Sequence, residues 1–247
     1  MERSKESVFT KVENKIATIE FGHLNENQLD SVLLTRLEKA FVEIEYDRKV
    51  SLVVLKSQKS DFFCRGLLPE VLNHNSLADI QTSLVQLAQL FKILLKYSKP
   101  IVARVDGKIV NDGLGLIACC DYVFATEASA LQINQMKKGL APLVTQLPLT
   151  DCIGTSGFDR LVWSPKTWQN AYWALEKGLY HRVFEKISEL DEALELFLNE
   201  LSQFSLEAMK TIKDNKLIMQ SYKPNLLEKS ALTAAKNFYH HIEASKE

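Results

Sequence analysis

Hydrophobic and polar positions alternate near the start of the chain and then change to a helical spacing. Residues 8–12 and 15–21 alternate around Glu13 and Asn14, a pattern typical of an antiparallel hairpin. Apolar residues then recur three and four positions apart over residues 31–46, which predicts an amphipathic helix. The chain is therefore expected to open with a strand pair followed by a helix.

Strand and helix patterns continue to alternate through the middle of the chain. An apolar strand is predicted near residues 51–55 and a loop over residues 57–68. Ser76 is placed to cap a long helix that reaches about Tyr97, because a serine side chain can accept a hydrogen bond from a first-turn N–H group. Repeated strand-then-helix units favour parallel strands joined by crossover helices. The fold class predicted is α/β.

From Pro165 onward the pattern becomes mainly helical. The predicted helices cover residues 165–175, 189–204, 205–219 and 226–241. A single strand near residues 179–184 interrupts them. We expect one domain, with a core over residues 1–185 and a C-terminal helical region over residues 186–247.

Composition and charge exclude some partners. A chain of 247 residues with 46% hydrophobic content is long enough to bury a sizeable core. A net charge of −1 gives no electrostatic footprint for nucleic acid or for a membrane surface. The N-terminus is charged and no apolar run reaches the length of a membrane span, so we expect a cytoplasmic protein.

The cysteines and histidines predict no metal site and no nucleophile. The four cysteines lack paired metal-ligand spacing and are expected to be reduced core thiols; they are Cys64, Cys119, Cys120 and Cys152. We expect Cys64, which lies in a loop, to be a buried packing residue rather than a nucleophile. The five histidines are scattered and none is assigned a catalytic role.

Residues 100–121 carry the most specific pattern. Pro100 opens an apolar β-branched run, and Gly107 and Gly113 permit sharp turns. The run over residues 114–120 is nearly all apolar, which predicts a buried helix directly after the turn. A helix that begins there points unpaired N–H groups at whatever lies above the strand ends.

This segment resembles the enoyl-CoA hydratase/isomerase, or crotonase, superfamily. The features in register are Lys99-Pro100, Gly107, Gly113, Leu116, Cys120-Asp121, the loop 61–66, Gly139 with Pro142, and the strand 178–184. Residues 120–127 and 170–180 are most similar to bacterial methylglutaconyl-CoA hydratase-like proteins. The resemblance implies a crotonase-like spiral of ββα units with a helical C-terminal region, and assembly into a homotrimer or homohexamer.

The resemblance also implies a thioester site. In the family, two backbone N–H groups form an oxyanion hole that stabilises an enolate. The matching catalytic positions here are Arg65 and Asp112, acting through their N–H groups. The positions expected to contact coenzyme A (CoA) are Gly66, Leu67, Leu68 and Gly113. The basic residues expected near its phosphates are Lys56, Lys59 and Arg65; the alternative is that these three are ordinary surface charges. Asn111 and Asp112 replace two family glycines, and the Asp112 carboxylate is interpreted either as a cap of its helix or as a base.

Both family glutamates are replaced. They match Gly115 and Gln135, and neither a glycine nor a glutamine amide can act as a base near neutral pH. Since a positioned acid or base contributes roughly 10² to 10⁴ in rate, ordinary hydration is expected to be very slow.

Two functional hypotheses remain open. The first is an enoyl-CoA hydratase/isomerase-type lyase or isomerase of fatty acid metabolism with altered catalytic residues, which binds an acyl-CoA as its substrate and needs no cofactor. The alternative is a non-catalytic subunit that binds an acyl-CoA or acyl-carrier thioester, or serves as a structural part of an oligomer.

Overall fold

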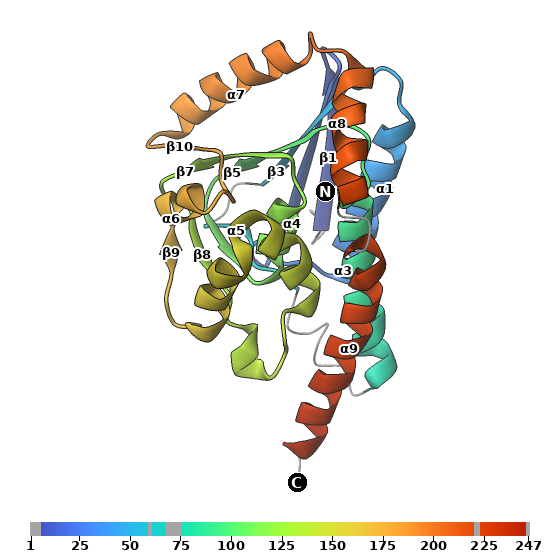
Figure 1. Cartoon of the computed structure of the whole chain (residues 1–247), viewed down its shortest axis with the longest axis vertical. Helices are drawn as coiled ribbons and strands as arrows, with labels where there is room; N and C mark the ends of the chain where they lie inside the picture. Colours follow the sequence, from blue (N-terminus) through green and yellow to red (C-terminus); the bar gives the residue numbers. More distant parts are fainter. Residues whose placement is uncertain (1–5, 59–60, 68–75, 220–222, 246–247) are drawn as a thin grey trace.

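Two sheets organise the molecule. The computed structural model describes residues 6–58, 61–67, 76–219 and 223–245 (Figure 1). The larger sheet has the order β1 (Glu6–Glu13), β2 (Ile16–His23), β3 (Leu52–Ser57), β5 (Ile101–Val105), β7 (Tyr122–Thr126) and β10 (Arg182–Phe184). The smaller sheet has the order β4 (Phe62–Cys64), β6 (Lys108–Val110), β8 (Ala130–Gln132) and β9 (Gln169–Asn170).

The chain winds between these sheets as a spiral. Its helices here are α1 (Ser31–Tyr46), α3 (Leu77–Leu95), α4 (Asp112–Ala118) and α5 (Leu143–Trp163), with the 3-10 helix η1 (Gln135–Lys138) before α5. Three times, a strand of the larger sheet is followed by a strand of the smaller sheet and then by a helix. The strands from β2 to β10 in the larger sheet pair in parallel. The predicted α/β spiral of ββα units is confirmed.

Local sequence signals explain where the first helices begin. The Asp30 carboxylate accepts a hydrogen bond from the Leu33 N–H at 2.7 Å, and α1 then covers the predicted residues. Ser76 caps α3 as expected, because its hydroxyl accepts from the Asp79 N–H at 3.2 Å. The apolar side chains of both helices face the core.

Two predicted elements differ from the structure, and one helix was not predicted. Part of the loop predicted over residues 57–68 forms β4. The helix α5 was not expected, because Pro148 lies within it and Gly154 breaks it with φ 69° and ψ 166°. The helix predicted over residues 165–175 is wrong: β9 comes first, and the short helix α6 (Ala171–Glu176) begins after Asn170 caps it.

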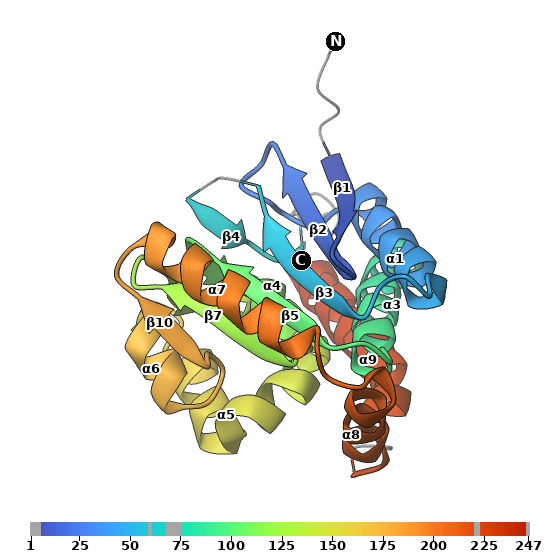
Figure 2. The same ribbon diagram turned by 90° about the horizontal axis from the view of Figure 1, so that it is seen from above.

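The C-terminal helices are α7 (Ile187–Leu201), α8 (Leu206–Met219) and α9 (Lys223–Ala244). The helix α9 lies beside α3 and joins the main core through Leu227, Ala231, Ala234, Ala235 and Phe238 (Figure 1). The helix α7 packs across the outer face of the larger sheet through Leu190, Leu194 and Leu198 (Figure 2). The described part of the chain contains no helix long and apolar enough to cross a membrane.

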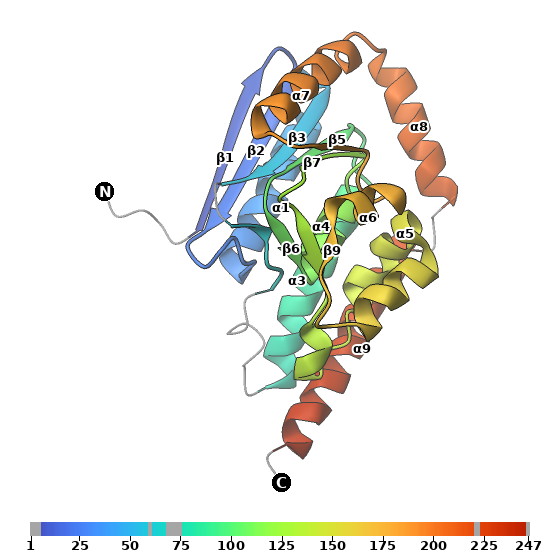
Figure 3. The same cartoon turned by 90° about the vertical axis from the view of Figure 1, so that its left-hand side faces the viewer.

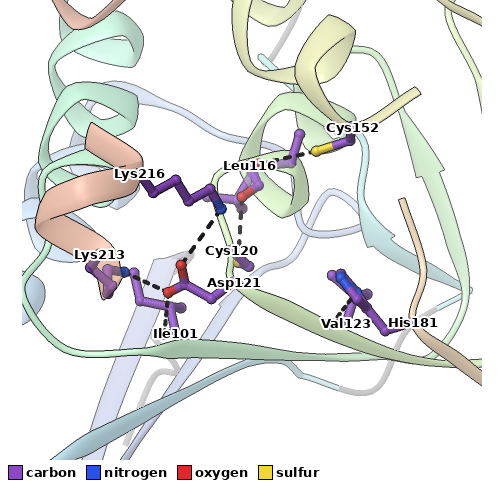
Figure 4. A network of polar contacts seen from close by, with 10 residues as sticks. Ile101, Leu116, Cys120, Asp121, Val123, Cys152, His181, Lys213 and Lys216 are labelled. Carbon is purple, nitrogen blue, oxygen red and sulfur yellow. Dashed lines mark hydrogen bonds and ion pairs between the residues drawn. The ribbon is translucent and has the colours of Figure 1, made fainter. Parts of the chain in front are cut away.

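The helix α8 is attached to the body mainly by charge. It leads from the end of α7 towards α9, and Met209 is its buried residue (Figure 3). The Asp121 carboxylate, at the start of β7, accepts from the Ile101 N–H at 2.8 Å and from the Lys213 ammonium at 2.5 Å (Figure 4). Lys216 lies 3.8 Å from the same carboxylate. The side chains of Leu206, Ile212, Ile218 and Met219 in α8 are exposed, and assembly through this region into a trimer or hexamer stays a prediction.

Substitution of Asp121 should loosen α8. In Asp121→Asn the half-buried Lys213 ammonium loses its charged partner, and we expect a loss of about 1.5–3 kcal/mol in the free energy of unfolding. Amide hydrogen exchange should rise selectively over residues 206–219. The matched control is Glu13→Gln, which removes the exposed Lys11–Glu13 pair. Equal exchange over α8 in both variants would contradict the attachment by Asp121.

Candidate functional site

The site is built where the loop after β4 meets the start of α4. Gly66 has φ 78°, and a Cβ atom added to it would lie 2.7 Å from the Asp112 nitrogen. A Cβ atom on Gly113 would lie 2.6 Å from the Cys64 carbonyl oxygen. Only glycine allows the two backbones to approach this closely. The N–H groups of Leu67 and Asp112 are thereby brought to the same place.

Asn111 holds the turn before α4 in an unusual conformation. It has φ 53° and ψ −119°, a region that non-glycine residues seldom adopt. Its side-chain oxygen accepts from the N–H groups of Asn134 at 2.8 Å and Gln135 at 3.2 Å. Its side-chain nitrogen donates to the Asn134 side-chain oxygen at 3.1 Å. These bonds offset the backbone strain and tie the start of α4 to η1.

The Asp112 carboxylate accepts hydrogen bonds from two different segments. One oxygen accepts from the Leu67 N–H at 3.2 Å and the other accepts from the Thr145 hydroxyl at 2.9 Å. Asp112 is 3% exposed, and burial raises the pKa of its carboxyl, while these two bonds and the neighbouring Gln135 side chain oppose the rise. The helix-cap interpretation is wrong, because the N-cap of α4 is Asn111 and the carboxylate reaches across to the loop and to α5.

The space beside Gly115 is filled by an aromatic ring. A Cβ atom added to Gly115 would lie 2.5 Å from Cε2 and 2.7 Å from Cζ of Phe91. Phe91 comes from α3 and is fully buried, so its ring has no free direction in which to move. The first family glutamate is therefore absent, and the position that it would need is occupied.

Gln135 takes the second glutamate position. It is buried at the start of η1, and its side-chain amide opposes the rise in the pKa of the Asp112 carboxyl that burial causes. An amide in this place stabilises a neighbouring carboxylate, whereas a glutamate would repel it. The structure thus brings three of the predicted positions, Asp112, Gly115 and Gln135, around Thr145, which the sequence did not indicate.

The loop residues divide between the site and the surface. The Leu67 N–H is the loop donor that meets Asp112, and its place directly after Gly66 is the signal that could have identified it. The Arg65 guanidinium pairs with Glu26 and lies 4.7 Å from the centre of the Phe62 ring. The role expected for the Arg65 N–H stays a prediction.

The remaining basic positions are ordinary or undescribed. Lys56 pairs with Glu20 at 2.6 Å on the larger sheet. Lys59 and Leu68 lie outside the described residues. Arg65 and Lys56 are therefore each paired with a carboxylate, and a role toward phosphates stays a prediction for both.

Cys64 is an inert packing residue, as expected. Its thiol is fully buried, and burial raises the pKa to about 12. A thiol with this pKa is neutral at physiological pH and is no nucleophile. Cys119 and Cys120 are likewise buried and free, which confirms them as core thiols.

Restoring the first glutamate alone should destabilise the protein. In Gly115→Glu the new side chain collides with the Phe91 ring, and overpacking of this kind costs about 1–3 kcal/mol or more. Adding Phe91→Ala should recover part of the unfolding midpoint lost in Gly115→Glu, although Phe91→Ala alone is destabilising through its cavity. Thermal unfolding of the two single variants and the double variant measures this coupling. Simple additivity of the two losses would show that the contact is unimportant.

The pH dependence of stability should report the buried carboxyl. The pKa of the Asp112 carboxyl is higher in the folded protein than in the unfolded chain, where it is about 3.9. Protonation of this group therefore stabilises the folded protein. The stabilisation is fully present below a pH of about 3.9 and is lost as the pH rises through the folded pKa. We therefore expect the free energy of unfolding of the wild type, relative to Asp112→Asn, to increase as the pH falls from neutrality. Urea unfolding of both proteins across this range measures the difference. A difference independent of pH would show that the surrounding polar groups fully cancel the effect of burial.

Comparison with known proteins gives these features a context. Mouse methylglutaconyl-CoA hydratase, mitochondrial, is 25% identical over 183 residues, which cover 72% of this chain and 57% of that protein. Mouse enoyl-CoA hydratase domain-containing protein 2, mitochondrial, is 24% identical over 165 residues, 66% of this chain and 55% of that protein. The chain thus spans little more than half the length of these relatives. Similarity to methylglutaconyl-CoA hydratases, predicted from the sequence, is confirmed as distant homology among several relatives.

The fold has close structural counterparts. An enoyl-CoA hydratase from Bacillus halodurans superimposes with a TM-score of 0.88 at 21% identity, covering 96% of this chain and 99% of that one. This likeness confirms the crotonase fold. The model of the family described as enoyl-CoA hydratase/isomerase matches residues 11–247. Because that match covers nearly the whole sequence, the chain belongs to the enoyl-CoA hydratase/isomerase, or crotonase, superfamily.

Proposed function

We propose that this chain binds an acyl-CoA thioester at the junction of the β4 loop and α4 and does not hydrate it. Family membership and the crotonase fold support the ligand class. The donor pair in this proposal consists of the N–H groups of Leu67 and Asp112, with Gly66 and Gly113 permitting the close approach of the backbones. Leu67 replaces Arg65 in the pair because its N–H is the one directed at Asp112.

The observation that carries the proposal is the replacement of both acid–base groups. Hydration requires one group that activates water and one that delivers a proton to the substrate carbon. Phe91 fills the space of the first, because a Cβ atom added to Gly115 would lie 2.5 Å from Cε2 of its ring. Gln135 stands at the second, and its amide cannot act as a base near neutral pH. These two changes favour a binding protein over a hydratase.

A second candidate function rests on Asp112. A carboxylate beside the expected thioester carbonyl could remove a proton next to that carbonyl and generate an enolate without hydration. This is the altered-enzyme hypothesis, and it requires the carboxylate to leave the Leu67 N–H and the Thr145 hydroxyl. Incubation of butyryl-CoA in D₂O, followed by mass spectrometry, distinguishes the two candidates. Deuterium incorporation that disappears in Asp112→Asn would support the enzyme.

Binding and hydration assays test the main proposal. We expect the wild type to bind crotonyl-CoA and free CoA in calorimetric titration and to show no hydration of crotonyl-CoA. Gln135→Glu alone should remain inactive, because the new carboxylate would face the Asp112 carboxylate. In Asp112→Gly with Gln135→Glu the donors are vacated and one acid–base group returns, so a gain of about 10²-fold over the wild type is expected.

The control for this series is Lys11→Ala, which removes an exposed charge far along the sequence from the site. It should bind both ligands as the wild type does. Rapid hydration by the wild type would contradict the non-hydrating half of the proposal. Failure of the wild type to bind either ligand would contradict the binding half.

A further inference from the structure

We infer that the Asp112 carboxylate is a built-in occupant of the oxyanion hole, and that it removes the preference of the site for a thioester carbonyl. This inference rests on the proposed CoA site and concerns its specificity. In the described residues, the loop donor that would bind the carbonyl oxygen, the Leu67 N–H, is already bonded to a side chain of the same chain.

The geometry explains the occupancy. A thioester oxygen would need both the Leu67 N–H and the Asp112 N–H. The first of these already donates to the Asp112 carboxylate at 3.2 Å, so a side chain of the protein takes one of the two donors. The other carboxylate oxygen is held by the Thr145 hydroxyl at 2.9 Å. The carboxylate is therefore anchored through both of its oxygens where the thioester oxygen would lie.

Charge and connectivity favour the internal occupant over a ligand. Hydrogen bonds to an ionised acceptor are roughly twice as strong as those to a neutral one, and a thioester carbonyl is neutral before reaction. The carboxylate is also tethered beside its donors, so it competes at a high effective concentration. The groups that face it are neutral: the Leu67 N–H, the Thr145 hydroxyl, the Gln135 amide and the Cys64 thiol.

The consequence concerns ligand discrimination. An open hole binds a thioester better than a thioether of the same length, because only the thioester has an oxygen to accept the two N–H groups. An occupied hole loses this difference, while contacts with the nucleotide and pantetheine parts of CoA are unaffected. Asp112 is thereby a specificity-determining residue.

Titration with a matched ligand pair tests this directly. The ligands are crotonyl-CoA and S-butyl-CoA, a thioether without the carbonyl oxygen. We expect the wild type to bind both with dissociation constants within about 3-fold of each other, and Asp112→Ala to prefer the thioester by about 10-fold. Asp112→Asn separates charge from occupancy, because its amide oxygen can still accept from the Leu67 N–H but carries no charge. Its preference for the thioester should lie between those of the wild type and Asp112→Ala. A thioester preference of the same size in the wild type and in Asp112→Ala would overturn the inference.

A second measurement does not depend on CoA binding. Removal of the carboxylate frees the Leu67 N–H and the Thr145 hydroxyl around a space of its shape, so acetate should bind there in Asp112→Ala. Acetate, compared with chloride at equal ionic strength, should raise the unfolding midpoint of Asp112→Ala by about 2–4 °C and leave the wild type unchanged. If neither CoA ligand binds any variant, the proposed function fails and the acetate result alone decides the inference. Equal acetate effects on both proteins would then overturn it.

Discussion

The buried Asp112 carboxylate constrains the junction on which the site depends, and among the described residues no cation pairs with it. Burying a charge is costly unless hydrogen bonds replace its hydration. Asp112, in α4, meets this requirement with donors from the loop after β4 and from α5, segments that are far apart in the sequence and meet because the chain is a spiral. The positions of these three segments therefore depend on one another. Asn111 strengthens the same junction by fastening α4 to η1.

The junction shows that backbone geometry and acid–base chemistry are separable in this fold. Gly66 and Gly113 keep the backbones in close approach, as a hole of backbone donors requires. The groups that would act as acid and base have nevertheless been replaced by packing at Gly115 and by an amide at Gln135. The presence of Gly66 and Gly113 is therefore weak evidence for hydration, since the same backbone arrangement here holds a carboxylate where a substrate oxygen would lie.

Local signals predicted most of the fold from the sequence. The bounds of α1, the Ser76 cap and the first hairpin depend on neighbouring residues and were confirmed. The helix α5 was not predicted, because Pro148 and Gly154 are ordinarily signs of a helix end. In the site, the altered positions were evident from their residue types. Their partners were not, because Thr145 and Phe91 reach them only through tertiary packing, which no local pattern records.

The ring of Phe91 over Gly115 also bears on how such a protein can change over generations. A glutamate cannot enter while the phenylalanine remains, and loss of the phenylalanine by itself leaves a void in the core. Each single step back towards an acid–base residue thus passes through a less stable molecule. Because of this contact, an acid–base residue at position 115 requires two coordinated changes, one at Gly115 and one at Phe91.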